Sequence, residues 1–432
     1  MLRSGCALVE ESTGTKGIME RTCWKHGSRS RARRRGASAF YGLIALAAGC
    51  NNATPPPPEP PPSACFCDTP ANATGIGVPD SFCVRRFALV KTPRTLAFAP
   101  NGDLFVGSPS MTTPGGAPVG LGGIYVLYDD NHDGRADSLR VYASGAAFAS
   151  VHGVLITGGK LYYTVEADVY SVPYTAGDRS LPAGVVPQRV ADLSDPGAAD
   201  RFTHTLAVDA AGDIYVSRGQ FDNSACPPPN PRSGAVLRIG PGHDLHGDIV
   251  VTGCRNPMYV NCAPWGCYAA ELTGDSWQGI GGTEKLVRMR DGDNYGYPCC
   301  VGHNLPVPSV QPPPDCSGVP VAVQSYPLQD TPFGFDWELQ NKFPAPYTGA
   351  LFMGFHGAFG SWNGTGLGWI PLDPVSHDPM AADQPFVTGF ALAGPVVGRI
   401  CEVRFAPDGR LFFTDDQGGG IYWVSPKRLC RT

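Results

Sequence analysis

A short apolar run, a Gly or Asn-Gly turn and an aromatic-rich run of strand formers return along the chain after residue 95. The first copy reads LAFAPNGDLFVG from Leu96, the second HGVLITGGKLYYT from His152, and the third HTLAVDAAGDIYVS from His204. Strand formers on both sides of a tight glycine turn are typical of β-hairpins. The pattern therefore predicts a chain built from repeated hairpins.

Three further copies follow, at residues 256–289, 347–371 and 401–424. No segment between the copies has a sustained helical period. Each copy holds two clear hairpin strands with weaker strands beside them, and four strands per unit around an axis form a β-propeller blade. The prediction is an all-β chain, a six-bladed β-propeller with long inter-blade loops. A seven-bladed ring or a pair of β-sandwiches are the alternatives.

Composition agrees with many short strands and tight turns. The 432 residues include 55 Gly and 43 Pro, yet 42% are hydrophobic and 16% charged, which is enough apolar material for a large core. The net charge is −5, and no basic run follows residue 36. A nucleic-acid-binding protein needs clustered Lys and Arg on one face, so this class of function is excluded.

The N-terminal region resembles an export signal. A basic run at residues 29–35 precedes an apolar stretch that ends in LAAGC at Cys50, which resembles a lipoprotein cleavage site. Residues 1–50 are thus expected to be a signal peptide, residues 51–63 a proline-rich tether, and residues 64–432 the propeller. We expect an exported protein of the cell envelope that touches the membrane only through a lipid anchor. An ordinary signal peptide is the alternative.

The cysteines after Cys50 point to disulfides. They number twelve, at positions 65, 67, 83, 226, 254, 262, 267, 299, 300, 316, 401 and 430. An even count in an exported chain favours up to six disulfides over a reduced metal cluster, since none has convincing zinc-ligand spacing with histidine.

Three ordered motifs in residues 251–298, VVTGCRNPMYV, ELTGDSW and KLVRMRDGDNYGYP, resemble the soluble quinoprotein glucose and aldose sugar dehydrogenases and the sorbosone dehydrogenases. FMGFHGAFGSWNGTG at 352–366 and the segment 398–424 extend the resemblance. It implies a six-bladed propeller that holds pyrroloquinoline quinone (PQQ) and Ca²⁺ and oxidises the anomeric hydroxyl of a sugar.

The resemblance also implies roles for particular residues. Arg255 and Asn256 would face the quinone, with Arg255 counted as catalytic too, and Arg399 would pair with a cofactor carboxylate. Backbone oxygens near Gly274 and Asp275 would face calcium. Arginine suits this task because its guanidinium binds carboxylates with two parallel hydrogen bonds. A plain polar turn between blades is the alternative for residues 255–257.

Further residues are expected around the cofactor or the sugar. His356, Trp362 and Asn363 would line the site from the fifth blade, with loop packing as the alternative. Trp277 and Tyr295 are weaker candidates for stacking on a sugar, and structural packing is favoured for them.

The sequence departs from the family at the general base. Alignment on the third copy puts Arg201 where the family has its catalytic histidine, and His204 falls three residues later. A base must reach the substrate hydroxyl within hydrogen-bond range, so His204 is the base only if a loop gap restores its position. Gln220 stands near the place of the carboxylate that assists the base. A catalytically degenerate propeller that binds carbohydrate or a protein partner is therefore the alternative function.

An acidic loop lies outside these motifs. Residues 129–137, DDNHDGRAD, place Asp129, Asn131, Asp133 and Asp137 at spacings that resemble the start of an EF-hand loop. The motif predicts a structural calcium site, with a solvated acidic hairpin tip as the alternative.

The leading expectation is a quinone-dependent oxidoreductase that acts on a small sugar or alcohol and passes electrons to an acceptor that the sequence does not identify. A hydrolytic, lactonase-type propeller would need a carboxylate-lined calcium at the channel centre, and no motif points to one.

Overall fold

The computed structural model describes residues 75–112, 118–194, 203–220, 226–273, 283–302, 304–357, 366–390 and 398–427. All of them lie in the unit Glu59–Thr432, whereas the unit Met1–Pro58 falls outside them. The signal peptide, the lipid anchor at Cys50 and the tether thus remain predictions. Within these ranges no helix is long and apolar enough to cross a membrane.

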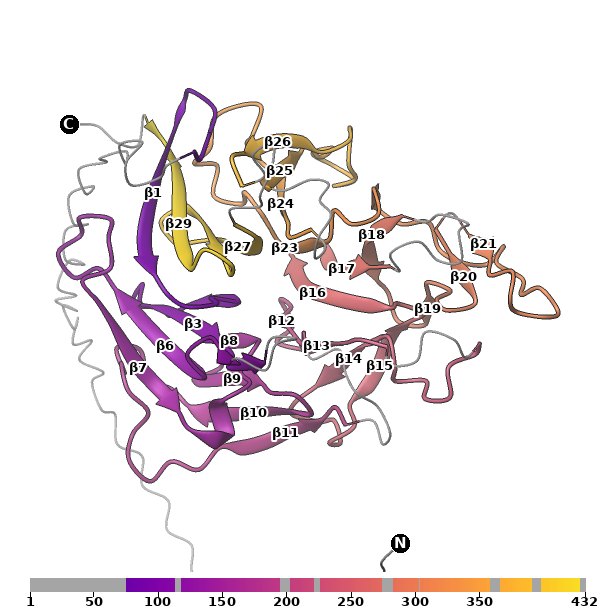
Figure 1. Cartoon of the computed structure of the whole chain (residues 1–432), viewed down its shortest axis with the longest axis horizontal. Helices are drawn as coiled ribbons and strands as arrows, with labels where there is room; N and C mark the ends of the chain where they lie inside the picture. The colour runs from indigo at the N-terminus through magenta and orange to yellow at the C-terminus, as the bar shows by residue number, and fades with distance from the viewer. Residues whose placement is uncertain are drawn as a thin grey trace, which may run out of the picture. The chain divides into compact units, whose positions relative to one another are not determined.

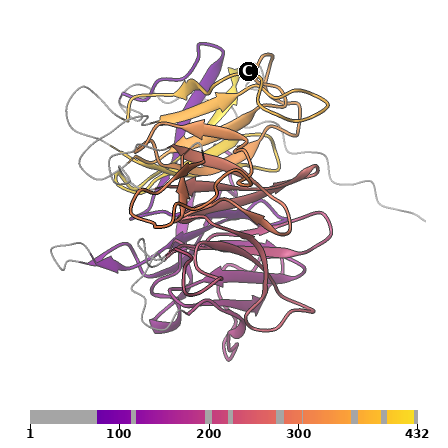
Figure 2. The same cartoon turned by 90° about the vertical axis from the view of Figure 1, so that its right-hand side faces the viewer.

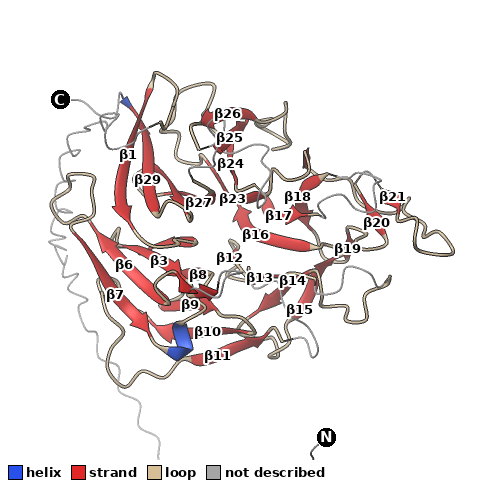
Figure 3. Ribbon diagram, in the orientation of Figure 1, coloured by secondary structure: helices blue, strands red, loops and turns tan. Residues whose placement is uncertain are grey.

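The described chain is almost entirely β-structure, with one short helical turn, η1 (Ala146–Phe148) (Figure 3). Six antiparallel sheets form the blades, numbered here in chain order by their inner strands (Figure 1). The predicted six-bladed β-propeller is confirmed. From the inner to the outer strand, blade 1 is β2 (Thr95–Phe98), β3 (Leu104–Ser108), β6 (Gly123–Tyr128) and β7 (Ser138–Ser144), and blade 2 is β8 (Val154–Thr157), β9 (Lys160–Thr164), β10 (Asp168–Pro173) and β11 (Gln188–Asp192). Blade 3 is β12 (Leu206–Val208), β13 (Ile214–Arg218), β14 (Ala235–Ile239) and β15 (Asp248–Thr252), and blade 4 is β16 (Asn256–Ala263), β17 (Gly266–Leu272), β18 (Glu284–Met289) and β22 (Gln324–Tyr326). Blade 5 is β23 (Pro332–Trp337), β24 (Leu351–Phe355), β25 (Gly366–Ile370) and β26 (Gln384–Val387), and blade 6 is β27 (Ile400–Phe405), β28 (Leu411–Asp415), β29 (Gly420–Pro426) and β1 (Phe82–Leu89).

Short pairs complete the strand list. These are β4 (Met111–Thr112) with β5 (Pro118–Val119), β20 (Cys300–Val301) with β21 (Leu305–Pro306), and β19 (Asp293–Asn294), which runs parallel to β15.

The N-terminal strand closes the ring. β1 pairs along its length with β29 and so supplies the outer strand of blade 6, beside the C-terminal strands in both views (Figures 1 and 2). The inner strands β2, β8, β12, β16, β23 and β27 each pack on the next, and β27 packs on β2. Because every blade has the same strand order, all six inner strands run in one direction around a central channel.

Apolar side chains fill the spaces between blades. The cluster between blades 5 and 6 includes Phe82, Phe343, Phe352 and Phe386, all 2% exposed or less. Their rings meet mostly edge to face, with the centroids of Phe82 and Phe386 4.9 Å apart. The aromatic strand formers of the repeats thus pack blade against blade.

Threonine hydroxyls join neighbouring blades close to the channel. The hydroxyl of Thr95 donates to the carbonyl of His152, Thr164 Oγ1 donates to the carbonyl of His204 at 2.8 Å, and Thr205 Oγ1 donates to Met258 O at 3.3 Å. The blades approach so closely that a Cβ on Gly153 would lie 2.7 Å from the carbonyl oxygen of His204. Backbone positions around the channel are therefore tightly held.

The cysteines follow the prediction in part. The disulfides with both partners described are Cys226–Cys299, Cys262–Cys267 and Cys300–Cys316, and Cys83 is disulfide-bonded as well. Cys254 and Cys401 are free and buried. The expected maximum of six disulfides is thus too high, because these two thiols lie in the apolar packing of different blades.

Candidate functional site

Charged and imidazole side chains precede the inner strands at one end of the channel. Arg94, Arg255 and Arg399 each come directly before an inner strand, of blades 1, 4 and 6. His152 and His204 come two residues before the inner strands of blades 2 and 3. Because all inner strands run in the same direction, these five residues gather at the same end. Arg255 and Arg399 precede the inner strands of different blades, and that both enter one central cavity stays a prediction.

Arg94, Asp416 and His356 form a buried chain of contacts across three elements. Nη2 of Arg94 lies 3.1 Å from Oδ2 of Asp416, and the same oxygen lies 3.1 Å from Nε2 of His356. Asp416 follows β28 and His356 follows β24, so blades 1, 5 and 6 each supply one member. Oδ1 of Asp416 is buried and has no hydrogen-bond partner among the described residues. This set, together with His152 and Arg399, is called the channel mouth below.

Electrostatics hold Asp416 ionised and His356 neutral. Burial alone would raise the pKa of Asp416, but Arg94 and His356 outweigh it and hold that pKa well below its usual value. Burial lowers the pKa of His356 despite the opposing effect of Asp416. A neutral His356 that donates from Nε2 to Asp416 carries its lone pair on Nδ1, the atom that can accept a proton.

Arg399 adds a second buried guanidinium to the channel mouth. Its Nη2 donates to the carbonyl of Gly357 at 2.6 Å, and its backbone N–H donates to Oδ1 of Asp415 at 2.8 Å. Burial lowers the pKa of Arg399, and the nearby charge of Arg94 lowers it further against the attraction of Asp416. Two guanidinium groups thus influence one another around Asp416, an arrangement that favours an anionic ligand.

Asp415 differs from its neighbour Asp416 because its carboxylate accepts backbone hydrogen bonds. Oδ1 accepts from the N–H groups of Arg399, Gln417 and Gly418. Burial raises the pKa of Asp415 to about 6. This carboxylate shapes the turn after β28, and Asp416 is the one that faces the cavity.

A cavity of about 390 Å³ leads to Asp416 from outside. Its walls come from the end of β1 and the residues after it, from the turn between β28 and β29, and from Gly120 before β6. They are Leu89, Val90, Lys91, Thr92, Gly120, Asp416, Gln417, Gly418 and Gly419.

His204 is buried between blades 2 and 3. Its Nδ1 lies 2.8 Å from the carbonyl oxygen of Ser217, and its Nε2 lies 3.2 Å from the carbonyl oxygen of Glu166. Burial lowers its pKa to about 4. Each ring nitrogen thus faces a backbone oxygen, so a base role for His204, which stays a prediction, would require the ring to turn.

Arg255 and Asn256 are held by neighbouring polar groups. The backbone N–H of Arg255 donates to Oε1 of Glu271, and its Nη1 donates to the carbonyl of Thr273 at 3.1 Å. Oδ1 of Asn256 accepts from Thr203 Oγ1 at 3.2 Å. The guanidinium of Arg255 thus contacts the residue that precedes the segment 274–282, which falls outside the described residues.

Several expected site residues lie outside the described ranges: Arg201, Gly274, Asp275, Trp277, Trp362 and Asn363. Their roles remain predictions. Gln220 is buried, and its backbone N–H donates to the carbonyl of Arg255. Tyr295 is 2% exposed and donates to the carbonyl of Arg288, which agrees with the packing role favoured for it.

The acidic loop is closed by its own amides. Asp129 accepts from the N–H groups of Asp133 and Gly134, and Asp137 accepts from Asp130 N and from both nitrogens of Asn131. Across the described part of the chain, no group of three or more His, Cys, Asp or Glu side chains is placed to hold a metal. Calcium at this loop remains a prediction.

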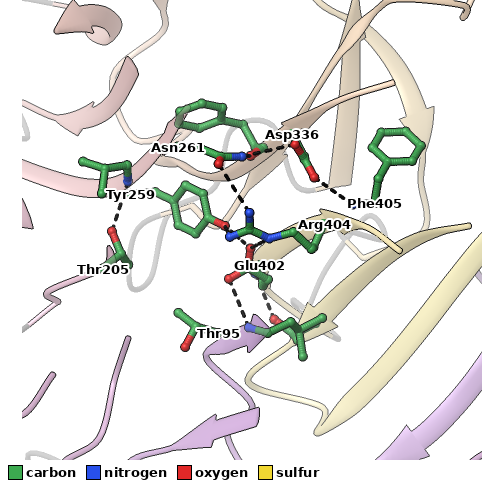
Figure 4. A network of polar contacts seen from close by, with 12 residues as sticks. Thr95, Thr205, Tyr259, Asn261, Asp336, Glu402, Arg404 and Phe405 are labelled. Carbon is green, nitrogen blue, oxygen red and sulfur yellow. Dashed lines mark hydrogen bonds and ion pairs between the residues drawn. The ribbon is translucent and has the colours of Figure 1, made fainter. Parts of the chain in front are cut away.

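Deeper in the channel lies a second polar cluster, here called the hub, made of Tyr259, Asn261, Asp336, Glu402 and Arg404 (Figure 4). Glu402, from β27, accepts a hydrogen bond from the Tyr259 hydroxyl of blade 4 and another from the N–H of Leu96 in blade 1 at 3.2 Å. Blades 4 and 6 are not neighbours, so this contact crosses the channel. Burial raises the pKa of Glu402 to about 7, although Arg404 opposes the shift.

Asp336 and Asn261 complete the hub from blades 5 and 4. Asn261 Nδ2 donates to Asp336 Oδ1 at 3.2 Å, and the other oxygen of Asp336 accepts from the N–H of Phe405 at 2.8 Å. Arg404 donates to Tyr259 at 2.6 Å and to Asn261 at 3.3 Å. Every carboxylate and amide oxygen of the hub therefore has a hydrogen-bond donor.

Sequence reasoning missed Arg94, His152 and Asp416. Arg94 and His152 occupy the position in repeats 1 and 2 that Arg255 and His204 occupy in repeats 4 and 3. Alignment of the chain's own repeats was the signal that would have found the first two. Asp416 lies in a turn and has no equivalent signal.

No model of a known protein family matches the chain, and no curated protein sequence matches it. Solved structures do. The calcium structure of a Trichoderma reesei protein of Carbohydrate-Active Enzymes family AA12 has a TM-score of 0.67 and 17% identity, covering 84% of this chain and 99% of its own. The PQQ domain of a Coprinopsis cinerea pyranose dehydrogenase has a TM-score of 0.65 and 15% identity, covering 81% and 97%.

The chain has the fold of the PQQ-dependent sugar dehydrogenases. A further neighbour, the PQQ-bound aldose sugar dehydrogenase of Streptomyces coelicolor, has a TM-score of 0.53 and 19% identity, covering 81% of this chain and 99% of that one. At such identities the likeness establishes the fold. It agrees with the resemblance that the motifs in residues 251–298 carry.

Proposed function

We propose that the protein is a PQQ-dependent sugar dehydrogenase of the cell envelope, exported and held by a lipid anchor at Cys50. The observation that carries the proposal is the channel mouth, where Arg94 and Arg399 lie around Asp416 and His356 at the end of a propeller channel. The fold likeness to sugar dehydrogenases and the motifs around Arg255 support the same chemistry.

The donor set fits the cofactor. PQQ carries several carboxylates and quinone oxygens, and the guanidinium groups of Arg94 and Arg399 are the donors that bind such groups best. Buried atoms without a partner in the described structure, namely Asp416 Oδ1 and both ring nitrogens of His152, mark this end of the channel as incomplete by itself. Arg94, Arg399 and Arg255 would hold the cofactor, and carbonyl oxygens near Gly274 and Asp275 would face calcium.

The residues of the channel mouth would then have separate roles in sugar oxidation. Bound quinone supplies the hydride acceptor for the carbon of the sugar's CH–OH group. We assign the base to His356, because Nε2 is held by Asp416 and Nδ1 is left to take the hydroxyl proton. Asp416 orients the ring and, since its pKa is low, stabilises the positive charge that forms. Substrate would reach this site from the solvent-exposed end of the channel.

The decisive experiment combines cofactor binding and turnover. The purified protein is mixed with PQQ and Ca²⁺, binding is followed by calorimetry, and reduction of a dye is measured with a panel of aldoses. Wild type is expected to bind and to turn over, and Arg399→Ala is expected to weaken binding about 10- to 100-fold through loss of a charge-assisted hydrogen bond. Arg410→Ala is the matched control, because Arg410 pairs with Asp408 on the surface of the same blade.

Binding without turnover would favour the alternative, a degenerate propeller that only binds its ligand. Absence of PQQ binding by wild type would reject the enzyme and leave the fold.

A further inference from the structure

His152 is the buried histidine whose ring nitrogens have no partner. Both Nδ1 and Nε2 are buried and make no hydrogen bond of normal geometry to a described residue, although a backbone group of His204 lies close enough to raise the pKa of the ring. The other two buried histidines of this region differ, because His204 faces two carbonyl oxygens and His356 faces Asp416. Buried polar atoms in folded proteins nearly always have a protein, water or ligand partner. A partner for His152 is therefore missing.

The backbone of His152 is held at the channel by neighbouring blades. Its N–H donates to the carbonyl of Thr164 at 3.2 Å, and its carbonyl accepts from the Thr95 hydroxyl. A Cβ on Gly107 would lie 2.7 Å from that carbonyl oxygen. Neighbouring backbone and side chains of blades 1 and 2 thus hold this residue in place.

Phe333 lies between His152 and His356. The ring centroid of Phe333 is 6.1 Å from that of His152 and 5.5 Å from that of His356. The imidazole thus packs near the same aromatic ring as the proposed base, from another blade.

Its surroundings keep His152 neutral. Burial lowers its pKa well below the usual value, and the charge of Arg94 lowers it further, against weaker effects of the His204 backbone and of Asp416. A neutral imidazole has one N–H donor and one lone pair. Beside the guanidinium of Arg94, its donor suits an oxygen of an anionic ligand.

We propose that His152 is a further cofactor-contacting residue, which donates a hydrogen bond from blade 2 to a carboxylate or quinone oxygen of the bound cofactor. This inference rests on the proposed function. It assigns the two unpartnered ring nitrogens to ligand binding, whereas a water molecule enclosed in the channel is the competing explanation.

The test separates stability from binding. Without cofactor, His152→Leu is expected to unfold at a higher temperature than wild type by about 1–3 °C, because an apolar side chain of similar size replaces two unpartnered polar atoms. With cofactor, calorimetry is expected to give a Kd for PQQ about tenfold weaker, the loss of one hydrogen bond to a charged group. His152→Gln retains an N–H donor and is expected to recover part of that affinity.

Tyr163→Phe is the matched control. Tyr163 lies on β9 of the same blade, is fully buried and has a hydroxyl without a partner among the described residues. Its removal is expected to stabilise the protein in the same direction and to leave the Kd for PQQ unchanged.

The outcomes are distinct. If His152→Leu binds PQQ within about twofold of wild type, water fills the site and the inference is wrong, while the proposed function stands. If His152→Leu unfolds at a lower temperature in the absence of cofactor, the ring has a partner in the empty protein and the premise fails. If wild type does not bind PQQ, the proposed function and this inference both fail.

Discussion

The channel holds two buried polar clusters that differ in how completely their carboxylate, amide and imidazole acceptors are paired, although Nε of Arg404 in the hub also has no hydrogen-bond partner among the described residues. In the hub, the carboxylate and amide oxygens of Glu402, Asp336 and Asn261 all accept hydrogen bonds from the protein. In the channel mouth, Asp416 Oδ1 and both ring nitrogens of His152 have no partner within the described ranges. Both clusters are buried and charged, so burial and charge alone do not distinguish them.

The difference follows from what each cluster must do. A network in which every oxygen accepts a hydrogen bond holds one arrangement in a low-dielectric interior and fixes how the blades meet. Unpaired buried groups cost stability, and where charged and imidazole groups of this kind gather at one end of the channel a ligand can supply their partners, unlike an isolated hydroxyl such as that of Tyr163. We therefore infer that the hub is a structural network that joins the blades across the channel, and that the channel mouth is the ligand site.

Removal of one hub partner should have the largest effect on stability. Arg404→Leu takes donors from Tyr259 and Asn261 and leaves Glu402 without its nearby cation. Breaking a buried charged network typically costs about 3–5 kcal/mol in free energy of unfolding, measured by urea denaturation. Arg410→Leu breaks a surface pair with Asp408 and the stacking of the guanidinium over Phe412 and Trp423, and should change it by about 1 kcal/mol or less. A loss below about 1 kcal/mol in Arg404→Leu would show that pairing in the hub is not what holds the blades.

The hub should also make stability depend on pH. The pKa of Glu402 is raised from 4.5 to about 7 by burial, so the folded state binds its proton more tightly than the unfolded state. The resulting stability is fully present below about pH 4.5 and is lost as pH rises through about 7. The full difference corresponds to roughly 3 kcal/mol.

Glu402→Gln isolates this effect, because glutamine mimics the protonated carboxyl at every pH. Relative to wild type, its free energy of unfolding should rise by up to roughly 3 kcal/mol between about pH 4.5 and about pH 8. The pKa of Asp415 and that of Asp330 are also raised by burial, each to about 6, so only the difference between the two proteins reports on Glu402. Parallel curves would mean that Glu402 stays ionised beside Arg404.

Features of the fold and of the candidate site could be predicted from the sequence where they depend on residues close together in the chain. The blades were predictable because each repeat carries its own hairpin signal, and the motif around Arg255 located the end of the channel where Arg255 and Arg399 lie. Arg94 and His152 have the same register in their repeats and were missed for lack of a repeat alignment. Local sequence determined all of these positions.

The hub and the orientation of side chains were beyond such reasoning. Tyr259 and Glu402 are 143 residues apart and belong to blades that are not neighbours. The sequence named His204 as a candidate base but gave no direction for its ring, which faces two carbonyl oxygens. An even cysteine count likewise could not reveal that Cys254 and Cys401 are buried and free.

At this end of the channel, His356 and His204 are the two candidates for the base. His356→Asn should lower turnover by about 100-fold or more, equivalent to about 2.7 kcal/mol, with the Kd for PQQ nearly unchanged. His204→Asn should mainly lower stability, because the ring of His204 contacts backbone oxygens of two blades. Dye-reduction kinetics and calorimetry on both variants decide the question. Loss of turnover in His204→Asn with activity retained in His356→Asn would reverse the assignment and return the base to the residue that the sequence indicated.

The acidic loop gives the smallest expected effect on stability. It also tests whether the pairing of oxygens, which separates the hub from the channel mouth, distinguishes structural clusters from ligand sites elsewhere in the chain. Its carboxylates accept amide hydrogen bonds, as those of the hub do, but several of its residues are exposed, so water and ions can reach them. The loop also docks on blade 6, where Trp423 Nε1 donates to the carbonyl of Gly134 at 2.8 Å. A bound ion would therefore stiffen the junction between the first and last blades.

The spacing of Asp129, Asn131, Asp133 and Asp137 predicts that calcium at about a tenfold excess over its Kd raises the unfolding temperature by about 2 °C, since only the folded loop binds it. The PQQ-free protein is used, in calcium-free buffer and after calcium addition, with magnesium as the ionic control. Asp133→Ala should abolish the shift, because it removes one of the carboxylates. If calcium raises the unfolding temperature of wild type but not of Asp133→Ala, the loop binds calcium although its oxygens accept hydrogen bonds. Paired oxygens would then exclude a ligand only where they are also buried. If calcium leaves the unfolding temperature of both proteins unchanged, the loop is an acidic turn closed by its own amide hydrogen bonds. Pairing of every carboxylate oxygen would then be typical of structural clusters in this chain.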